Sequence, residues 1–255
     1  MVIEKFTRKP LPSENVALIR AHPLVRGMEA CLLLNDVAGG FAVDLVRHSK
    51  SPIVGCVRAV RLDAVCLDTA AAGDKIQTER SFSLGNTWSI RIVCYRLSSG
   101  IGTAFGRYFG TAINLTELLN AGDNVDFSIN GTAVYTGAAG VFSVDPGVRN
   151  DVVITSDGAN VRTYSKGSLV RTDAFTGSMD SGAIVFGNIL DGSRTGDVII
   201  EQGQVWSRPL SGAEVHRLYF DPWGYLRPVI RRTYFVAAAA EADELLLSRR
   251  LIGVP

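Results

Sequence analysis

The feature that most constrains the fold is a run of three short strand patterns at residues 151–170, DVVITSDGANVRTYSKGSLV. Apolar valines recur in each of the three segments, as expected for strands with one buried face. The pattern breaks at Ser156-Asp157-Gly158 and at Lys166-Gly167, where residues that tolerate a positive φ occur. These residues predict a β-meander. Such a sheet needs a second layer to cover its apolar face.

Further strand patterns supply that second layer. The most regular one, WSIRIVCYRL, places Trp88 and Ile92 on one side and Arg91 on the other. Because side chains alternate along a strand, we expect one face in a core and the arginines toward water or a cleft. The other predicted strands are residues 28–34, 41–45, 64–67, 75–78, 183–187 and 196–206, the last either a strand pair or one long bent strand.

Two local motifs carry sharp signals. Asn130-Gly131 lies between alternating segments in residues 125–135, which predicts a type I′ hairpin. Ser211-Gly-Ala-Glu214 matches a capping box and predicts a short helix over 212–219. Residues 98–124 are the vaguest part: their glycines indicate loops, and 115–119 suggest one helical turn.

The chain of 255 residues is long enough for one large β domain, since sandwiches often exceed roughly two hundred residues. We predict an all-β fold, a two-sheet antiparallel jelly-roll sandwich with one short helix, spanning residues 27–220. Residues 1–26, which contain prolines without a clear apolar period, and residues 221–255 are predicted as terminal arms. We expect both arms to be poorly ordered in an isolated monomer and ordered on assembly.

Charge and composition exclude several classes of partner. The 26 basic and 25 acidic residues leave a formal charge of +1, which offers no field for nucleic acid or an anionic membrane. No signal peptide or membrane-spanning run is found, so a soluble protein is expected. The spacing and apolar context of the four cysteines indicate buried free thiols and not zinc ligands or disulfides. These cysteines are Cys31, Cys56, Cys66 and Cys94.

Several segments together resemble the laminin-G-like branch of the concanavalin A-like lectin/glucanase jelly rolls. They are LLLND, LDTAAAGDKI, the meander VITSDGANVRTYSKGSLV and the closing IVFGNILDGSRTGDVIIEQGQVWSRPLSGAEVHRLY, which is the most specific match. The resemblance covers about residues 27–220, and between 98 and 150 it is a likeness of strand pattern alone. It implies the same jelly-roll sandwich and a lectin or glucanase ancestry.

The flanks resemble something narrower. RKPLPSENVALIRAHPLVRGMEACLLLND and DPWGYLRPVIRR look like the arms around this jelly roll in structural proteins of tailed bacteriophages. The resemblance implies a virion component, made in the cytoplasm of a bacterial host.

No catalytic set is convincing. A glucanase of this superfamily needs paired carboxylates at alternate strand positions, and the nearest pair, Asp197 and Glu201, is four residues apart. The acidic residues Glu241, Asp243 and Glu244 lie in the C-terminal arm. We therefore expect no enzyme and no cofactor, and we interpret the three histidines, His22, His48 and His216, as solvated.

The sequence does not assign a binding site either. Trp88, Trp206 and Trp223 are the available platforms for a sugar, but the strand pattern favours burial of the first two. Asp68 and Asp74 flank a small-residue loop that could bind calcium, although such residues more often cap turns, so no metal is expected. No ligand-binding residue is assigned.

Three classes of function follow: enzyme, carbohydrate-binding module and virion structural protein. The last is preferred, as a head or tail decoration or accessory component that contacts other virion proteins and copies of itself. The alternative is a module that recognises a host-surface glycan.

Overall fold

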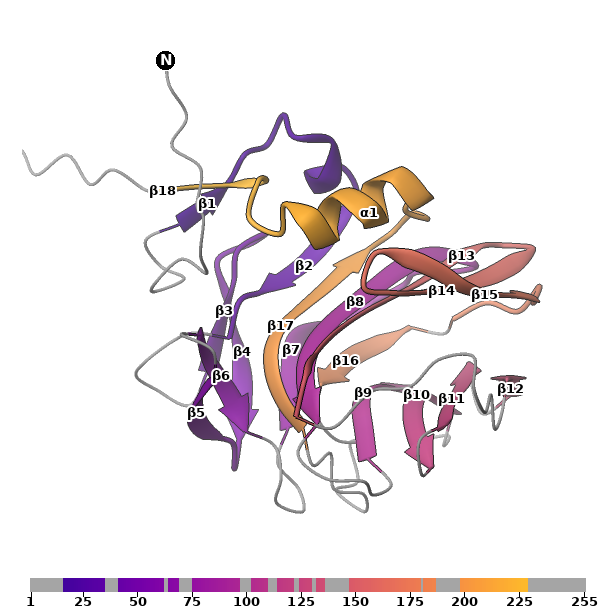
Figure 1. The fold of residues 1–255 in the computed structure, drawn as a ribbon, viewed down its shortest axis with the longest axis horizontal. Helices are drawn as coiled ribbons and strands as arrows, with labels where there is room; N and C mark the ends of the chain where they lie inside the picture. Colours follow the sequence, from indigo (N-terminus) through magenta and orange to yellow (C-terminus); the bar gives the residue numbers. More distant parts are fainter. Residues whose placement is uncertain are drawn as a thin grey trace, which may run out of the picture.

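The computed structural model describes eleven stretches of the chain. They are residues 16–34, 41–61, 64–68, 75–96, 102–109, 114–121, 124–129, 132–135, 147–179, 181–186 and 198–228. Within them, sixteen strands form one antiparallel ladder that folds over on itself into two layers (Figure 1). The predicted fold class, an antiparallel two-layer sandwich with one short helix, is confirmed.

The front layer runs β15 (Ser168–Ala174), β14 (Asn160–Ser165), β13 (Arg149–Asp157), β8 (Thr87–Arg96), β17 (Val198–Trp206), β2 (Met28–Leu32) and β3 (Phe41–Asp44). The back layer runs β4 (Ser49–Val54), β7 (Lys75–Phe82), β16 (Gly182–Phe186), β9 (Gly102–Phe109), β10 (Asn114–Ala121), β11 (Asn124–Ile129) and β12 (Thr132–Tyr135). Strand β4 pairs with both β3 and β7 and so joins the layers. The hairpin of β5 (Val57–Arg61) and β6 (Ala64–Asp68) pairs with the first half of β17.

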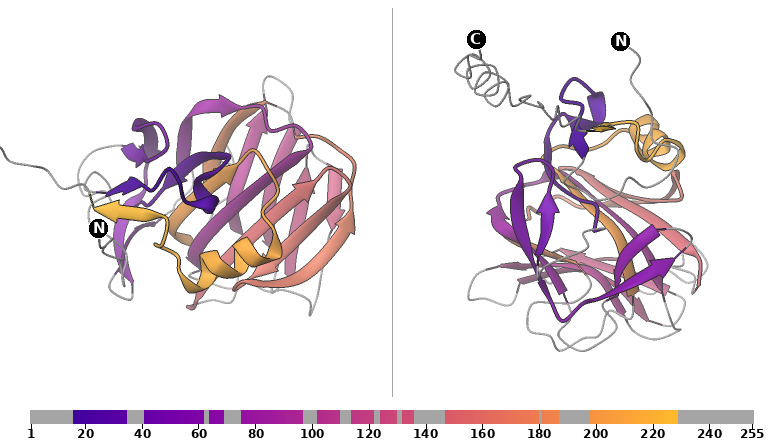
Figure 2. Two further views of the ribbon diagram at one scale, coloured as in Figure 1. Left: turned by 90° about the horizontal axis from the view of Figure 1, so that it is seen from above. Right: turned by 90° about the vertical axis from the view of Figure 1, so that its left-hand side faces the viewer.

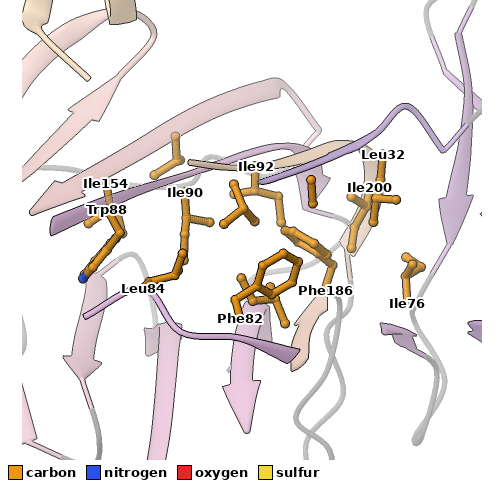
Figure 3. Packing of buried hydrophobic residues seen from close by; sticks show 14 of the residues in the cluster. Leu32, Ile76, Phe82, Leu84, Trp88, Ile90, Ile92, Ile154, Phe186 and Ile200 are labelled. Atoms are coloured by element: carbon orange, nitrogen blue, oxygen red, sulfur yellow. The ribbon is translucent and has the colours of Figure 1, made fainter. Parts of the chain in front are cut away.

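An apolar cluster fills the space between the layers (Figure 3). We call it the interlayer cluster; its buried members are Ala30, Leu32, Leu34, Ala42, Ile76, Phe82, Leu84, Trp88, Ile90, Ile92, Cys94, Ile129, Val152, Ile154, Val161, Met179, Ile184, Phe186, Ile200 and Val205. Alternate residues of β8 (Trp88, Ile90, Ile92 and Cys94) and of the middle of β13 (Val152 and Ile154) belong to it, as strand alternation requires. Burial of this apolar surface is the main force that holds the layers together.

A second apolar cluster covers the opposite face of the front layer. This outer cluster comprises Val16, Leu18, Leu24, Val25, Met28, Cys31, Leu33, Leu45, Val153, Tyr164, Trp206, Leu210, Val215, Leu218, Trp223, Tyr225 and Leu226. Its cover is made by β1 (Val16–Leu18), the 3-10 helix η2 (Pro23–Val25), α1 (Gly212–Phe220) and β18 (Leu226–Pro228). These elements lie across the front-layer strands (Figure 2).

The described parts of both arms are therefore structural. We expected the arms to be poorly ordered in a monomer, but β1 and β18 pair with each other, and Leu24 and Trp223 are buried within the same chain. The physical reason is that the front layer has an apolar outer face, which these segments shield from water. Residues 1–15 and 229–255 lie outside the described residues.

Most of the predicted local structure is confirmed. Lys166 and Gly167 both have positive φ (50° and 81°), as a type I′ turn between β14 and β15 needs. Ile129 pairs with Thr132, so the hairpin of β11 and β12 has the predicted connection. Both hydrogen bonds of the capping box between Ser211 and Glu214 are present. Within the segment predicted at 196–206, the described residues form one strand, β17, with a bulge.

Two expectations were wrong. Residues 115–119 form no helical turn but lie in β10, within the region 98–124 that we interpreted as loops. Strand β10 is paired on both sides, with β9 and β11, and ladder hydrogen bonds override the weak local helix preference. Strand β9 lies in the same region and was not predicted, and neither were β1, β4, β5 and β18. No helix in the described residues is long and apolar enough to span a membrane.

Candidate functional site

Polar side chains form a band beneath the outer cover of the front layer. Strand alternation that sends Ile90 and Ile92 into the interlayer cluster turns Arg91 to the outer face. The polar band, as we call it, consists of Arg91 and Tyr95 on β8, Arg149 and Asp151 on β13, and Glu201 and Gln204 on β17. It is the largest group of interacting buried charges among the described residues and is therefore the candidate site.

Arg91 and Asp151 form a fully buried bidentate ion pair. Nε of Arg91 donates to Oδ1 of Asp151 at 2.9 Å and Nη2 donates to Oδ2 at 2.5 Å. The side chains are 0% and 3% exposed. Burial by itself lowers the pKa of Arg91, but the charge and hydrogen bonds of Asp151 outweigh burial and raise it. The guanidinium of Arg91 therefore stays charged in the folded protein.

Arg91 also links the sheet to its cover. Its Nη1 donates to Oε1 of Gln204 at 3.2 Å, and its Nη2 donates to the carbonyl oxygen of Leu218 in the last turn of α1 at 3.2 Å. A cation is stabilised there because helix carbonyls near the C-terminus carry partial negative charge. The guanidinium thus joins β8, β13, β17 and α1.

Arg149 and Glu201 form the second ion pair of the band. Nε and Nη2 of Arg149 donate to the two carboxylate oxygens of Glu201 at 2.8 and 3.1 Å, and Tyr95 Oη lies 3.5 Å from Oε2. Burial opposes the charge of Arg149, but Glu201 raises the pKa of Arg149 overall. Arg149 is 27% exposed, whereas Glu201 is 3% exposed, so this end of the band reaches solvent through the arginine.

Beneath β18 the band ends in neutral groups. Nε2 of Gln204 donates to Tyr225 Oη and to Oε1 of Gln202, the second at 3.1 Å. Burial raises the pKa of Tyr225 well above its usual value and that of Cys31 to about 12, so both stay protonated. The C-terminal segment is thus joined to the sheet by a hydrogen bond as well as by apolar contacts.

This arrangement holds each buried carboxylate against an arginine. A glycoside hydrolase needs one carboxylic acid that donates a proton and a second carboxylate that acts as nucleophile or base. Asp151 and Glu201 each accept two hydrogen bonds from an arginine, so both oxygens of each carboxylate are engaged within the chain. The chemistry that the band supports is therefore structural cross-linking of sheet and cover.

The tryptophans considered as sugar platforms are core residues. Trp88 and Trp206 are fully buried, as the strand pattern favoured, and Trp223 is 6% exposed. The indole Nε1 of Trp206 donates to the carbonyl oxygen of Leu24 at 2.7 Å, which fastens η2 to β17. None of the three presents a ring face to a ligand.

The remaining candidate residues are dispersed. His48 and His216 are exposed, and His22 caps η2, where its Nδ1 accepts from the amide of Leu24. Cys31 and Cys94 are buried free thiols as predicted, and Cys56 is a half-buried thiol whose Sγ donates to the carbonyl oxygen of Val54 at 3.4 Å. Outside the described residues or side chains lie Cys66, Asp68, Asp74, Asp197, Glu241, Asp243 and Glu244. The described residues contain no cluster of potential metal ligands.

Sequence reasoning missed the band itself. It placed Arg91 on the correct face of its strand but expected water or a cleft there, and it gave Asp151 no role. Asp151 pairs with Val93, and Arg91 reaches it diagonally across two strands. Since the sequence separation is 60 residues, the only available signal was a charged residue in an otherwise apolar strand, which is unusual unless the charge is paired.

Solved structures share the fold at low sequence identity. The sialidase of Trypanosoma rangeli in complex with sialic acid superposes with a TM-score of 0.60 and 14% identity, over 76% of this chain and 33% of that one. The receptor binding domain of botulinum neurotoxin type G gives a TM-score of 0.56 and 13% identity, over 78% and 54%. The chain thus spans about a third to a half of these proteins, and the likeness shows the fold alone.

Sequence comparison identifies the family. No curated protein matches this chain. The sequence pattern of the concanavalin A-like lectin/glucanases superfamily matches residues 69–216, more than half of the chain, from the position after β6 into α1. This span includes the meander and all but the last three residues of the closing segment that first suggested the family. The chain belongs to the concanavalin A-like lectin/glucanases superfamily.

Proposed function

We propose that this protein is a structural component of a bacteriophage virion, a decoration or accessory protein of the head or tail that attaches through its terminal segments. The observation that carries the proposal is the pairing of β1 with β18, in which Val16 lies opposite Pro228. Residues 1–15 and 229–255 therefore depart from neighbouring points on the outside of the sandwich. We call residues 1–15 and 229–255 the tethers. Because both begin beside the Val16–Pro228 pair, they would anchor the sandwich on one side.

The outer cluster supports this proposal. The flanking segments that resemble phage proteins contribute Val16, Leu24, Trp223 and Tyr225 to it, so the flanks and the sandwich form one folded unit. A firm connection between tether and body transmits load from an attachment point to the whole domain. The polar band beneath strengthens that connection.

We further propose that the protein is not an enzyme. Both buried carboxylates of the polar band are neutralised by arginines, and the outer face of the front layer is closed by α1, η2 and β18. A screen of the full chain on β-glucans and bacterial surface polysaccharides is expected to give no turnover. Turnover that is lost in Glu201→Gln would contradict this assignment.

Truncation tests the attachment. A variant that lacks residues 229–255 keeps the outer cluster and is expected to fold but to be lost from virions, because only the tether is removed. A variant cut at 221 instead loses Trp223 and Tyr225 and serves as the control for misfolding. The measurement is the amount of protein in purified particles, together with the circular dichroism spectrum of each variant. Normal incorporation without residues 229–255 and without residues 1–15 would overturn the proposal.

Carbohydrate binding is the second candidate. It is favoured by membership of a superfamily of lectins and glucanases and by similarity to a sialidase in complex with sialic acid and to a neurotoxin receptor binding domain. A sugar site would have to use residues other than the three tryptophans, since these are buried. Saturable binding of the full chain to a bacterial surface glycan, together with normal incorporation after the truncations, would make this the better assignment.

A further inference from the structure

The described part of the chain engages almost all of its carboxylates internally. Arginines form ion pairs with six of them, namely Glu29, Asp151, Asp157, Asp173, Glu201 and Glu214. Asp44 is buried, and Asp221 has an interaction within the chain. Among the side chains that the structure describes, the only exposed acidic one is Glu79, on β7 of the back layer. The exposed lysines and arginines are therefore not balanced at the described surface; they are Arg20, Arg26, Arg47, Lys50, Lys166, Arg217 and Arg227.

Two of these arginines meet at the tip of the hairpin formed by β3 and β4. Nη2 of Arg20 donates to the carbonyl oxygen of Val46 at 3.0 Å, which places the Arg20 guanidinium on the turn between the two strands. Arg47 and His48, the next two residues of that turn, are exposed. Basic side chains from two distant segments of the chain are thus held together at this tip.

The strands from which both tethers leave bring a third arginine to the same side of the sandwich (Figure 1). Arg227 lies on β18 opposite Ala17 of β1, and the amide of Ile19 donates to the carbonyl oxygen of Tyr225. The pairing of these two chain segments therefore extends to the residue before Arg20. We call the resulting group the basic corner; it consists of Arg20, Arg47, His48 and Arg227.

The carboxylate nearest to the tip in sequence is directed into the protein. Asp44 is 3% exposed, and its Oδ1 accepts hydrogen bonds from two backbone amides at 2.9 and 3.0 Å. Burial raises the pKa of Asp44, and the two amides, Arg80 and Arg47 offset this only in part. Among the described residues, no ion pair joins a carboxylate to any arginine of the basic corner. The corner therefore keeps its positive charge toward solvent.

The sequence adds charge of the same sign close to the two tether exits. Arg231 and Arg232 follow Pro228 by three and four positions, whereas one acidic residue, Glu14, comes two positions before Val16. A partner that approaches this corner meets an excess of positive charge. Electrostatic complementarity then requires an anionic surface on the partner.

We propose that the basic corner binds an acidic surface of a neighbouring virion protein, beside the point from which both tethers leave. The inference rests on the proposed function and names the chemistry of the partner. The three arginines of the corner present planar guanidinium groups, which match the two oxygens of a carboxylate. Attraction between the two surfaces also steers the sandwich toward its attachment point and speeds association.

A protein partner fits this corner better than nucleic acid does. The formal charge of the whole chain is +1, and the corner is a compact group of side chains, whereas a phosphate backbone is followed by a basic stripe. The C-terminal tether also carries the apolar stretches 234–236 (YFV) and 245–247 (LLL). A protein surface buries such residues with gain, but phosphates do not. The partner therefore combines acidic and apolar surface.

Charge reversal at two residues tests the proposal. Arg47→Glu/Arg227→Glu, the corner variant, changes two exposed side chains that donate no hydrogen bond to a described residue, so its circular dichroism spectrum is expected to match that of the parent. We expect the amount of this variant in purified particles to fall by about tenfold or more. Arg26→Glu/Arg217→Glu is the matched control, because it changes the net charge equally but lies beside and on α1. This control is expected to be incorporated as the parent is.

A measurement on the purified chain does not depend on particles. We expect the full chain to bind labelled poly-L-glutamate saturably at low ionic strength, with a dissociation constant that rises by about tenfold or more in the corner variant. Added NaCl should weaken binding of the parent, since salt screens exposed charges. Arg47→Gln/Arg227→Gln removes the two charges without reversing them and is expected to have an intermediate effect. Fluorescence anisotropy gives each dissociation constant.

Three results would overturn the inference. They are normal incorporation of the corner variant, an equal loss in the control, and binding of duplex DNA but not of poly-L-glutamate through the corner arginines, which would assign the corner to nucleic acid. If a chain without residues 229–255 and a chain without residues 1–15 were both incorporated normally, the proposed function would fail while poly-L-glutamate still tested the corner. Loss of incorporation in the truncations but not in the corner variant would contradict this inference alone.

Discussion

The interlayer cluster and the outer cluster lie on opposite faces of the same front-layer strands, yet they are built differently. The interlayer cluster is apolar and is made by strands of both layers, most of them within the span that matches the family. The outer cluster is completed by segments at the two ends of the described chain and encloses the polar band. The comparison teaches that one face of the front layer is built mostly within the span that matches the family, while the other depends mostly on residues outside that span.

The largest expected effect tests whether the buried ion pairs of the polar band determine the stability of the outer face. Arg91→Met leaves Asp151 buried without its partner and is expected to lower the free energy of unfolding by about 3–5 kcal/mol. The double variant Arg91→Met/Asp151→Leu should recover most of that loss, since no unpaired charge remains. Urea unfolding measures both. Arg171→Met is the control, because its pair with Asp173 lies at the sheet edge with the arginine 30% exposed, where about 0–1 kcal/mol is expected.

The second prediction asks whether the two clusters unfold together. Leu32 in the interlayer cluster and Leu218 in the outer cluster are both fully buried. We expect Leu32→Ala and Leu218→Ala each to cost about 2–5 kcal/mol with one shared transition, because the front layer belongs to both clusters. The measurement is urea unfolding of each variant, followed both by tryptophan fluorescence and by circular dichroism, and the midpoints from the two signals are compared. Separate midpoints in Leu218→Ala alone would show that the outer cover is an independent unit.

A smaller effect is expected where the cover meets the meander. Gly167 has φ +81° and lies under Tyr219, so Gly167→Ala adds both backbone strain and a collision, about 1–3 kcal/mol in total. Gly85→Ala is the matched control, since Gly85 has φ +63° but open space around it. Only the strain, about 1 kcal/mol, should remain there. Thermal unfolding measures the stability of both variants. If Gly167→Ala and Gly85→Ala lost the same stability, the contact between Gly167 and α1 would have no role.

The smallest effect concerns a turn outside both clusters. Amides of Ala159 and Asn160 donate to Asp157, and these bonds, together with Arg162, lower the pKa of Asp157 to about 2. A depressed pKa in the folded state contributes stability above the ordinary value near 3.8, and this contribution is lost as the pH falls through about 2. We expect Asp157→Asn to cost about 0.5 kcal/mol or less at pH 7, given solvent screening, and nothing near pH 2. Urea titrations at several pH values check the trend, and a difference that persists at pH 2 would contradict it.

Much of the fold was predictable because its signals are local. The turns at Gly158 and Lys166-Gly167, the hairpin of β11 and β12 and the capping box of α1 each depend on residues a few positions apart. Strand β10 was missed since its leucines fit a helix as well as a strand, and only pairing with β9 and β11 decides between them. The strands at the two ends were missed for the same reason: β1 and β18 are three residues each and, among the strands that the structure describes, pair only with one another.

The sequence by itself determined the sandwich, the faces of its strands and the burial of Trp88 and Trp206, because alternation and turn chemistry act between neighbouring residues. Only the tertiary structure decided what covers the outer face of the front layer. Arg91 meets Asp151 over 60 positions, Trp206 meets Leu24 over 182, and Val16 meets Pro228 near the two ends of the described chain. Such contacts exist only once the sheet has brought distant segments together, so no pattern within a short stretch of sequence encodes them.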